Sequence, residues 1–343
     1  MLREVVGCAR VLFVAVGGGG DAVTAAMLAL AARREGLESF TASIVWERFS
    51  VDPVPGPIPL EELRGAERVG EFSAAVNGDT VAVRRGRRIA IQAANVARAL
   101  NEKVYVVDAY RGARGIAQGL RELVELLGVD AVVGVDVGGD VVALGYEEEL
   151  WSPLADSMGL AAVATTPAEG IEKVLAIHSP GADGELPPEY VLRRVASIAA
   201  IGGLRGARGI TLQDIGVLER ILRYAHSEAS RVQLEAFRGG FGEALIRGGS
   251  RRVRLSPLQT ITFFLDALKA LALAPLAQLV IGTDSVFDAR RVLNSVGVYT
   301  ELDLEEDVYR FVEEHGREPT PREVLEMRRA GRLRLTPFMG SER

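Results

Sequence analysis

The feature that most constrains the fold is a regular alternation of short apolar segments with longer amphipathic segments over residues 10–200. The apolar segments predict strands at residues 10–16, 42–48, 104–108, 131–137 and 174–177. The amphipathic segments predict helices at residues 21–36, 91–100, 115–127, 153–165 and 187–200. Apolar strands that alternate with helices form parallel sheets covered on both faces. We therefore predict a Rossmann-like three-layer α/β/α fold with a mostly parallel sheet.

The alternation of strands and helices ends after Gly202. Helices are expected at residues 212–225, 228–238, 286–296, 304–314 and 321–329, with one further strand at residues 261–265. Turn residues predict two hairpins, at residues 72–83 around Asn77-Gly78-Asp79 and at residues 244–255 around Arg247-Gly248-Gly249. We therefore divide the chain into a Rossmann-like α/β domain with glycine-rich ligand loops, residues 1–205, and a smaller α+β region, residues 206–343, packed on the first.

Composition excludes several classes of protein. A formal net charge of -6 and a pI near 5.4 argue against a nucleic-acid-binding protein, which would carry a basic surface. Cys8 is the single cysteine, so disulfides within the chain and zinc-thiolate sites are excluded and a cytoplasmic location is expected. No apolar run reaches the 18–20 residues that a membrane span needs. The basic residues are 37 Arg against 3 Lys, a bias that a thermophilic source or a GC-rich genome would produce.

Three loops that follow predicted strands combine glycine with aspartate. They cover residues 17–21, 136–140 and 179–185. The carboxyl ends of parallel strands lie along one edge of a sheet, where ligands bind in open α/β folds. We therefore expect Gly19, Asp21, Asp140, Asp183 and Gly184 to line one pocket.

The residue types in these loops suggest binding of a metal and a phosphate. Clustered carboxylates repel one another unless a cation, a proton or an arginine offsets their charge, and Mg²⁺ commonly bridges carboxylates to substrate phosphates. Glycines let backbone N–H groups approach a phosphate closely. The candidate metal ligands are Asp21, Asp136, Asp140 and Asp183. The candidate ligand-binding glycines are Gly17, Gly18, Gly19, Gly20, Gly138, Gly139, Gly181 and Gly184. The candidate catalytic residues are Asp140, Asp183 and His178.

Three functions remain open on this pattern. The first is an enzyme of phosphoryl or nucleotidyl chemistry that binds a nucleotide or a phosphorylated metabolite with Mg²⁺. The second is an NAD(P)- or FAD-type dinucleotide-binding oxidoreductase or sensor, because Gly17-x-Gly19-x-x-Ala22 loosely fits the fingerprint and Glu47 follows as the acid. Asp21 favours the first over the second, since a carboxylate at the helix start repels pyrophosphate unless a cation lies between them. The third is a non-enzymatic ligand-binding or assembly subunit, a candidate homo-oligomer whose apolar stretch 265–281 would bury the interface.

Other polar residues have simpler interpretations. Ser152 precedes a proline and is expected to cap a helix, and Asp156 is expected to face outward or toward the second loop. The acidic residues 301–307 are expected to form a solvated helix face. His226 and His315 are expected on the surface.

The sequence resembles an uncharacterised family, a domain of unknown function found mainly in archaea and in some actinobacteria. The resemblance rests on the motifs GGGGD, VGGD and GxDGEL at residues 17–21, 137–140 and 181–186, and on segments 152–156, 256–258 and 297–304. It implies one architecture over most of the chain. It implies no particular reaction.

Overall fold

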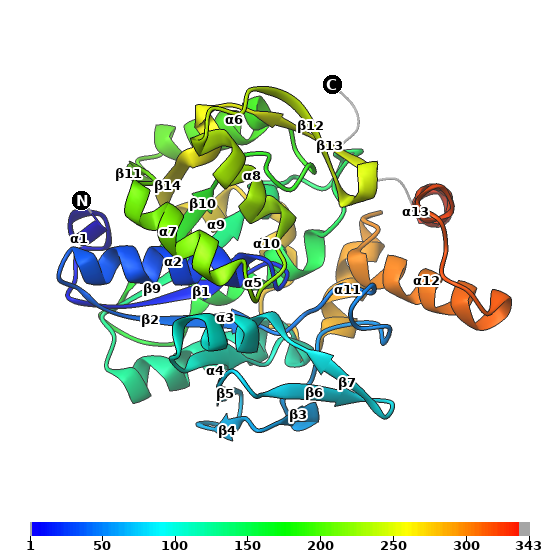
Figure 1. Ribbon diagram of the computed structural model, residues 1–343, viewed down its shortest axis with the longest axis horizontal. Coiled ribbons are helices and arrows are strands. Elements are labelled where there is room, and N and C mark those ends of the chain that lie inside the picture. Colours follow the sequence, from blue (N-terminus) through cyan, green and yellow to red (C-terminus); the bar gives the residue numbers. More distant parts are fainter. Residues whose placement is uncertain (1, 336–343) are drawn as a thin grey trace.

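A nine-stranded sheet forms the centre of the molecule in the computed structural model, which describes residues 2–335 (Figure 1). Smaller sheets of three and two strands lie beside it. The strands are β1 Arg10–Ala15, β2 Glu38–Ile44, β3 Leu63–Arg64, β4 Glu67–Arg68, β5 Ser73–Val76, β6 Val81–Arg84, β7 Arg87–Ala90, β8 Val104–Val107, β9 Ala131–Val137, β10 Glu172–His178, β11 Leu204–Gly209, β12 Gly242–Ile246, β13 Arg251–Leu255 and β14 Ile261–Asp266. The order in the central sheet is β11-β14-β10-β9-β1-β2-β8-β5-β4.

The five middle strands, from β10 to β8, are parallel to one another, and antiparallel strands extend the sheet on both sides. All seven residues of β9 are buried, as expected for a parallel strand covered on both faces. The predicted α/β fold with a mostly parallel sheet is therefore confirmed.

Helices cover both faces of the sheet (Figure 1). They are α1 Leu2–Val6, α2 Asp21–Arg34, α3 Gln92–Leu100, α4 Gly112–Leu127, α5 Pro153–Thr165, α6 Pro188–Ala200, α7 Leu212–Ile221, α8 Glu228–Phe237, α9 Ala267–Ala272, α10 Pro275–Leu279, α11 Val286–Ser295, α12 Glu301–His315 and α13 Pro321–Arg334. Leu12 and Val14 of β1 belong to the core under α4 and α5, whereas Val11 and Phe13 belong to the core under α2 and α3. This period of two follows from the strand pleat.

Two predicted elements are wrong. The second strand covers β2 rather than residues 42–48, because Trp46 leaves the sheet: its carbonyl accepts a hydrogen bond from Gly19 and its indole N–H donates to Glu305. Residues 72–83 are not a hairpin. The turn at Asn77 forms, but β5 pairs with β8 in the central sheet while β6 pairs with β3 and β7 in another.

The later part of the chain adds to the same central sheet. Strand β14 lies between β10 and β11 and is antiparallel to both. The predicted hairpin at residues 244–255 is confirmed as β12 and β13. The apolar stretch 265–281 runs through α9 and α10 and packs mostly against α5 in the core. A domain boundary at residue 205 stays a prediction, and residues 336–343 of the second region lie outside the described part of the chain.

Candidate functional site

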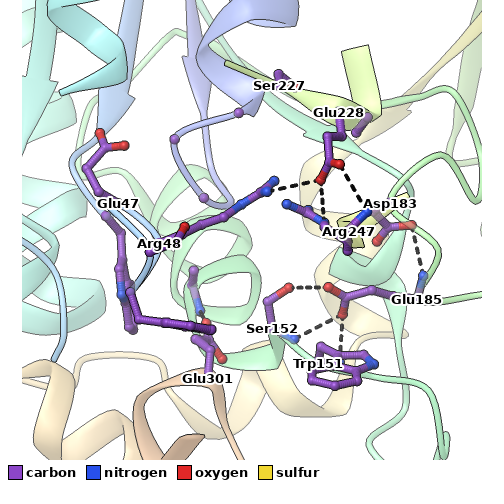
Figure 2. A pocket seen from close by; sticks show the side chains of 18 of the residues that line it. Glu47, Arg48, Trp151, Ser152, Asp183, Glu185, Ser227, Glu228, Arg247 and Glu301 are labelled. Atoms are coloured by element: carbon purple, nitrogen blue, oxygen red, sulfur yellow. Dashed lines mark hydrogen bonds and ion pairs between the residues drawn. The ribbon is translucent and has the colours of Figure 1, made fainter. Parts of the chain in front are cut away.

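The loops after β1, β9 and β10 converge on one pocket with a volume of about 540 Å³ (Figure 2). Strand β1 lies between β2 and β9, so the connections that leave β1 and β9 depart to opposite sides of the sheet. Ligands of open α/β sheets bind at such a switch point. Gly19, Asp21, Asp140 and Asp183 line this pocket as predicted, whereas Gly184 does not.

The pocket is strongly acidic, since ten carboxylic side chains line it against three arginines. Asp21, Asp136 and Asp156, from the start of α2, the end of β9 and the first turn of α5, form one cluster. One carboxylate oxygen from each lies within 4.8 Å of the others. Asp136 and Asp156 are only 1% and 3% exposed, and Oδ2 of Asp136 and Oδ1 of Asp156 accept no hydrogen bond from any group within residues 2–335. We call this cluster the acidic trio. The positive charge around it is too small to offset the negative charge of three ionised carboxylates.

Burial is the main cause of the abnormal ionisation of the acidic trio. It raises the pKa of Asp136 to about 7. Burial, followed by the charges of Asp136 and Asp183, raises the pKa of Asp21 well above its usual value. Burial, followed by Asp136 and Asp21, does the same for Asp156. A cation between these carboxylates would reverse the shifts, because it favours the charged forms.

A second acidic cluster contains Asp140, Asp183 and Glu185, but its hydrogen bonds differ from those of the acidic trio. Glu185 accepts hydrogen bonds from the backbone N–H of Trp151 at 2.7 Å and from Ser152 Oγ at 2.6 Å, and Arg251 lies 2.8 Å away. Burial alone would raise the pKa of Glu185, but Arg251, followed by these hydrogen bonds, lowers it. Glu185 therefore has the partners it needs and anchors the segment before α5.

Ser152 stands at the N-cap position of α5, as predicted, but its side chain makes no cap hydrogen bond. Its hydroxyl bonds to Glu185 and to Asp140 Oδ2, the latter at 3.2 Å. Oδ2 of Asp183 is buried and has no hydrogen-bond donor in the described part of the chain. The second cluster thus contains one free acceptor oxygen beside groups that are held in place.

The glycines of the three loops have two different roles. Gly18, Gly19 and Gly20 line the pocket, and Gly20 precedes α2 without a side-chain cap, so the start of this helix opens on the pocket. Gly17 and Gly138 lie behind it: a Cβ on Gly17 would collide with the carboxylates of Asp21 and Asp156, and one on Gly138 with that of Asp183. These two glycines give the buried acids their room.

Besides Gly17 and Gly138, three further predicted ligand-binding glycines do not line the pocket: Gly139, Gly181 and Gly184. All have positive φ angles, and their hypothetical Cβ atoms would meet Val191, Pro188 and Arg251 respectively. These three glycines allow the tight turns that support the site.

His178, predicted as a catalytic base, does not reach the pocket either. It is fully buried in β10, and its Nδ1 lies 2.6 Å from the hydroxyl of Thr262 on β14. Burial lowers its pKa to about 4, so the ring is neutral at physiological pH. The sequence alone did not indicate that β14 pairs with β10. Strand β14 covers His178, which would have been open if β10 were the edge of the sheet.

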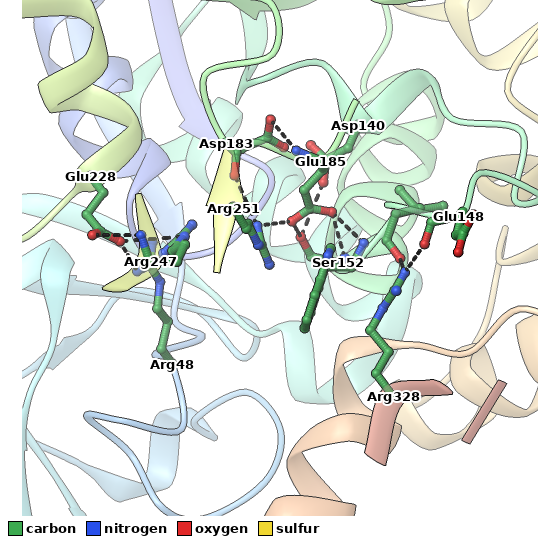
Figure 3. A network of polar contacts seen from close by, with 12 residues as sticks. Arg48, Asp140, Glu148, Ser152, Asp183, Glu185, Glu228, Arg247, Arg251 and Arg328 are labelled. Atoms are coloured by element: carbon green, nitrogen blue, oxygen red, sulfur yellow. Dashed lines mark hydrogen bonds and ion pairs between the residues drawn. The ribbon is translucent and has the colours of Figure 1, made fainter. Parts of the chain in front are cut away.

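The three arginines form the basic side of the pocket (Figure 3). Arg48 and Arg247 share Glu228 as a partner, with Arg48 Nη1 3.4 Å from its carboxylate. Nη1 of Arg247 has no hydrogen-bond partner among the residues that the structure describes. Burial, then repulsion from Arg251, lowers the pKa of Arg48 to about 10. Two guanidinium groups with one acid between them leave positive charge to attract an anion.

Sequence reasoning missed several acids that line the pocket. Asp156 faces Asp21 and, in the second loop, Asp136, so the second of its two predicted directions is the observed one, although it was not named as a candidate metal ligand; the signal was that it is the single charged residue within 153–164. Glu301 and Glu305 are not a solvated face. Glu301 accepts hydrogen bonds from the backbone of Leu154 and Ala155, at 3.0 and 2.6 Å, and Glu305 accepts from the Trp46 indole at 3.0 Å. Burial raises the pKa of Glu301 to about 8 and that of Glu305 to about 7.

Glu47, predicted to bind a dinucleotide, does line the pocket. It accepts a hydrogen bond from the backbone N–H of Gln92 at 2.8 Å, and its Oε2 lies close to Gly19. Burial raises its pKa to about 7.

Fold and site together define an α/β protein with an acidic, arginine-flanked pocket at the carboxyl edge of its parallel sheet. A family model matches residues 12–309, and the chain belongs to that family, described as a protein of unknown function (DUF1152). No curated protein and no solved structure matches the chain. No helix within residues 2–335 is long and apolar enough to cross a membrane.

Proposed function

We propose that the pocket binds Mg²⁺ together with a nucleotide or a phosphorylated metabolite, and that it promotes phosphoryl or nucleotidyl transfer. The observation that carries this proposal is the acidic trio. Buried carboxylate oxygens without donors are costly, and natural proteins rarely keep them without a ligand or a proton. Mg²⁺ prefers carboxylate oxygens and typically completes its coordination with water and phosphate.

The opposite side of the pocket supports the phosphate part of the proposal. The start of α2, which no side chain caps, directs the positive end of the helix dipole toward the pocket. Arg48 and Arg247 add guanidinium groups that suit phosphate oxygens. A cation on one side and arginines on the other would stabilise the charge that develops on a transferred phosphoryl group. Asp140 and Asp183 remain the candidates for proton transfer.

A dinucleotide-binding function is the second candidate, because Glu47 lies beside Gly19 within the pocket. The two candidates differ in their need for metal. A dinucleotide site built on Gly19 and Glu47 would raise the melting temperature with NAD(P) or FAD in the presence of EDTA, whereas the Mg²⁺ site would give no shift under that condition.

Calorimetric titration tests the proposed function. Mg²⁺ and then inorganic pyrophosphate are titrated into the wild type, Asp156→Asn and Asp79→Asn, the last being a control at a side chain that is 98% exposed. We expect Asp156→Asn to weaken Mg²⁺ binding at least tenfold, about 1.4 kcal/mol, and to abolish Mg²⁺-dependent pyrophosphate binding. Asp79→Asn should match the wild type. Equal binding by all three proteins, or binding by none, would refute the proposal.

A further inference from the structure

Four apolar side chains contribute to the lining of the pocket, and together they are called the apolar wall. Phe49 and Val51 come from the loop after β2, Leu304 from α12, and Val324 from the first turn of α13. Val51 and Leu304 are 253 residues apart in the sequence (304 minus 51). We propose that this wall holds an apolar organic group of the ligand, so that the substrate class is the phosphate ester of an aromatic or aliphatic alcohol. This inference rests on the proposed function.

The first support is that the apolar wall belongs to a hydrophobic core cluster but is still partly exposed to solvent. Leu304 is buried in a cluster with Trp151, whereas Phe49 and Val324 pack on that cluster and remain only partly buried. Val51 is 47% exposed. Partly exposed apolar side chains inside a concave pocket are typical of sites for organic ligands. Burying them against an apolar group would remove further surface from water.

The second support is that the acids near the wall are already used. Both oxygens of Glu305 accept hydrogen bonds, from the Trp46 indole and from the backbone of Gly56 at 2.7 Å. Glu301 is bonded to the start of α5 in the same way. A ligand group such as a sugar needs free donors and acceptors around it, and these two glutamates offer few. The wall therefore favours an apolar group over a polyhydroxylated one.

The third support is the size of the pocket. Its volume of about 540 Å³ lies within the range of about 300–1,000 Å³ found for sites of small organic molecules. Inorganic phosphate with Mg²⁺ would occupy a small part of it. Arg48, one of the pocket arginines, directly precedes Phe49 of the apolar wall in the sequence.

Calorimetry on the full chain in the presence of Mg²⁺ tests the inference with three probes: inorganic phosphate, phenyl phosphate and hexyl phosphate. We expect at least one ester to bind ten times more tightly than inorganic phosphate. Phenyl phosphate as the tighter ester would assign an aromatic group, and hexyl phosphate an aliphatic one. Val324→Asp should remove the gain and change the affinity for inorganic phosphate less than twofold.

Leu333→Asp serves as the control, because Leu333 lies on the same helix and is 87% exposed outside the pocket. Phe49→Ala provides a second variant if Val324→Asp does not fold. Esters that bind no more tightly than inorganic phosphate would overturn this inference and leave the proposed function standing. Absence of Mg²⁺-dependent binding for all three probes would overturn both.

Discussion

At the scale of single residues, the site depends on pairs of a buried acid and a glycine that leaves space for it. Gly138 accommodates the carboxylate of Asp183, and Gly17 those of Asp21 and Asp156. Glycine-rich loops are usually interpreted as phosphate sites, because the backbone of a glycine can approach a phosphate closely. In this site glycine has a second role: the carboxylate of another residue occupies the space that a glycine side chain would have filled.

Gly138→Ala should therefore be more harmful than an ordinary glycine replacement. Its Cβ would displace Asp183, and the backbone has a φ of +123°. Gly170→Ala is the matched control, since Gly170 also has a positive φ, +72°, but nothing within 4 Å of a Cβ. We expect Gly138→Ala to lower the free energy of unfolding by about 1–3 kcal/mol more than Gly170→Ala, as overpacking does. Urea unfolding measures both, and equal losses would contradict this role.

The sequence predicted part of the site at this scale. Asp21, Asp140 and Asp183 lie in loops that follow predicted strands, and Asp136 lies at the end of one, so the parallel arrangement alone brings them to one edge. The direction of Asp156 was left open between two alternatives and Glu301 was misplaced, because both residues lie on helices. The direction of a helical side chain depends on how the helix docks against the rest of the molecule, which local periodicity does not specify.

At the scale of elements, the β12–β13 hairpin carries the basic side of the pocket. Its turn holds Arg247 and the first residue of β13 is Arg251. The hairpin packs on Val137 and Ala182 through Val253 and neighbouring apolar side chains. It was predicted correctly because its turn signal and its pairing are both local. The predicted hairpin at residues 72–83 is wrong because β5 pairs with β8 and β6 pairs with β3 and β7, so the two strands do not pair with each other.

Arg247→Gln should weaken phosphate binding without loss of the fold. Glutamine keeps a polar but shorter side chain and removes the charge that Glu228 only half neutralises. Arg252→Gln on the same hairpin is the control, because Arg252 is 76% exposed and pairs with Glu243 at the surface. We expect at least a tenfold loss of affinity for pyrophosphate with Mg²⁺ in the first variant and none in the second. Equal affinities in calorimetry would exclude Arg247 from the anion site.

At the scale of the whole molecule, the buried acids couple stability to pH. Asp136 and Glu301 have folded-state pKa values of about 7 and 8, far above those of an unfolded chain. The folded state therefore holds more protons than the unfolded state between about pH 4 and pH 8. The stability that this provides is present in full below the unfolded pKa and is lost as the pH rises through the folded pKa.

We expect the free energy of unfolding in EDTA to fall from pH 5 to pH 8, with a slope of up to about 1.4 kcal/mol per pH unit for each such group. Mg²⁺ should reduce the slope, because a cation bound to the acidic trio offsets the charge that deprotonation creates. Glu301 is outside the trio and should leave a residual slope. Urea unfolding at four pH values measures this; identical slopes with EDTA and with Mg²⁺ would contradict a cation site.

The position of β14 between β10 and β11 has a consequence for synthesis on the ribosome. His178 ends β10, but its neighbour in the sheet is completed only at Asp266, 88 residues later. At about 5–20 residues per second the nascent chain spends roughly 4–18 seconds with this apolar edge unpaired. Unpaired strand edges are templates for aggregation. Translation pauses between these two residues would therefore lower the yield of folded protein more than pauses elsewhere in the chain.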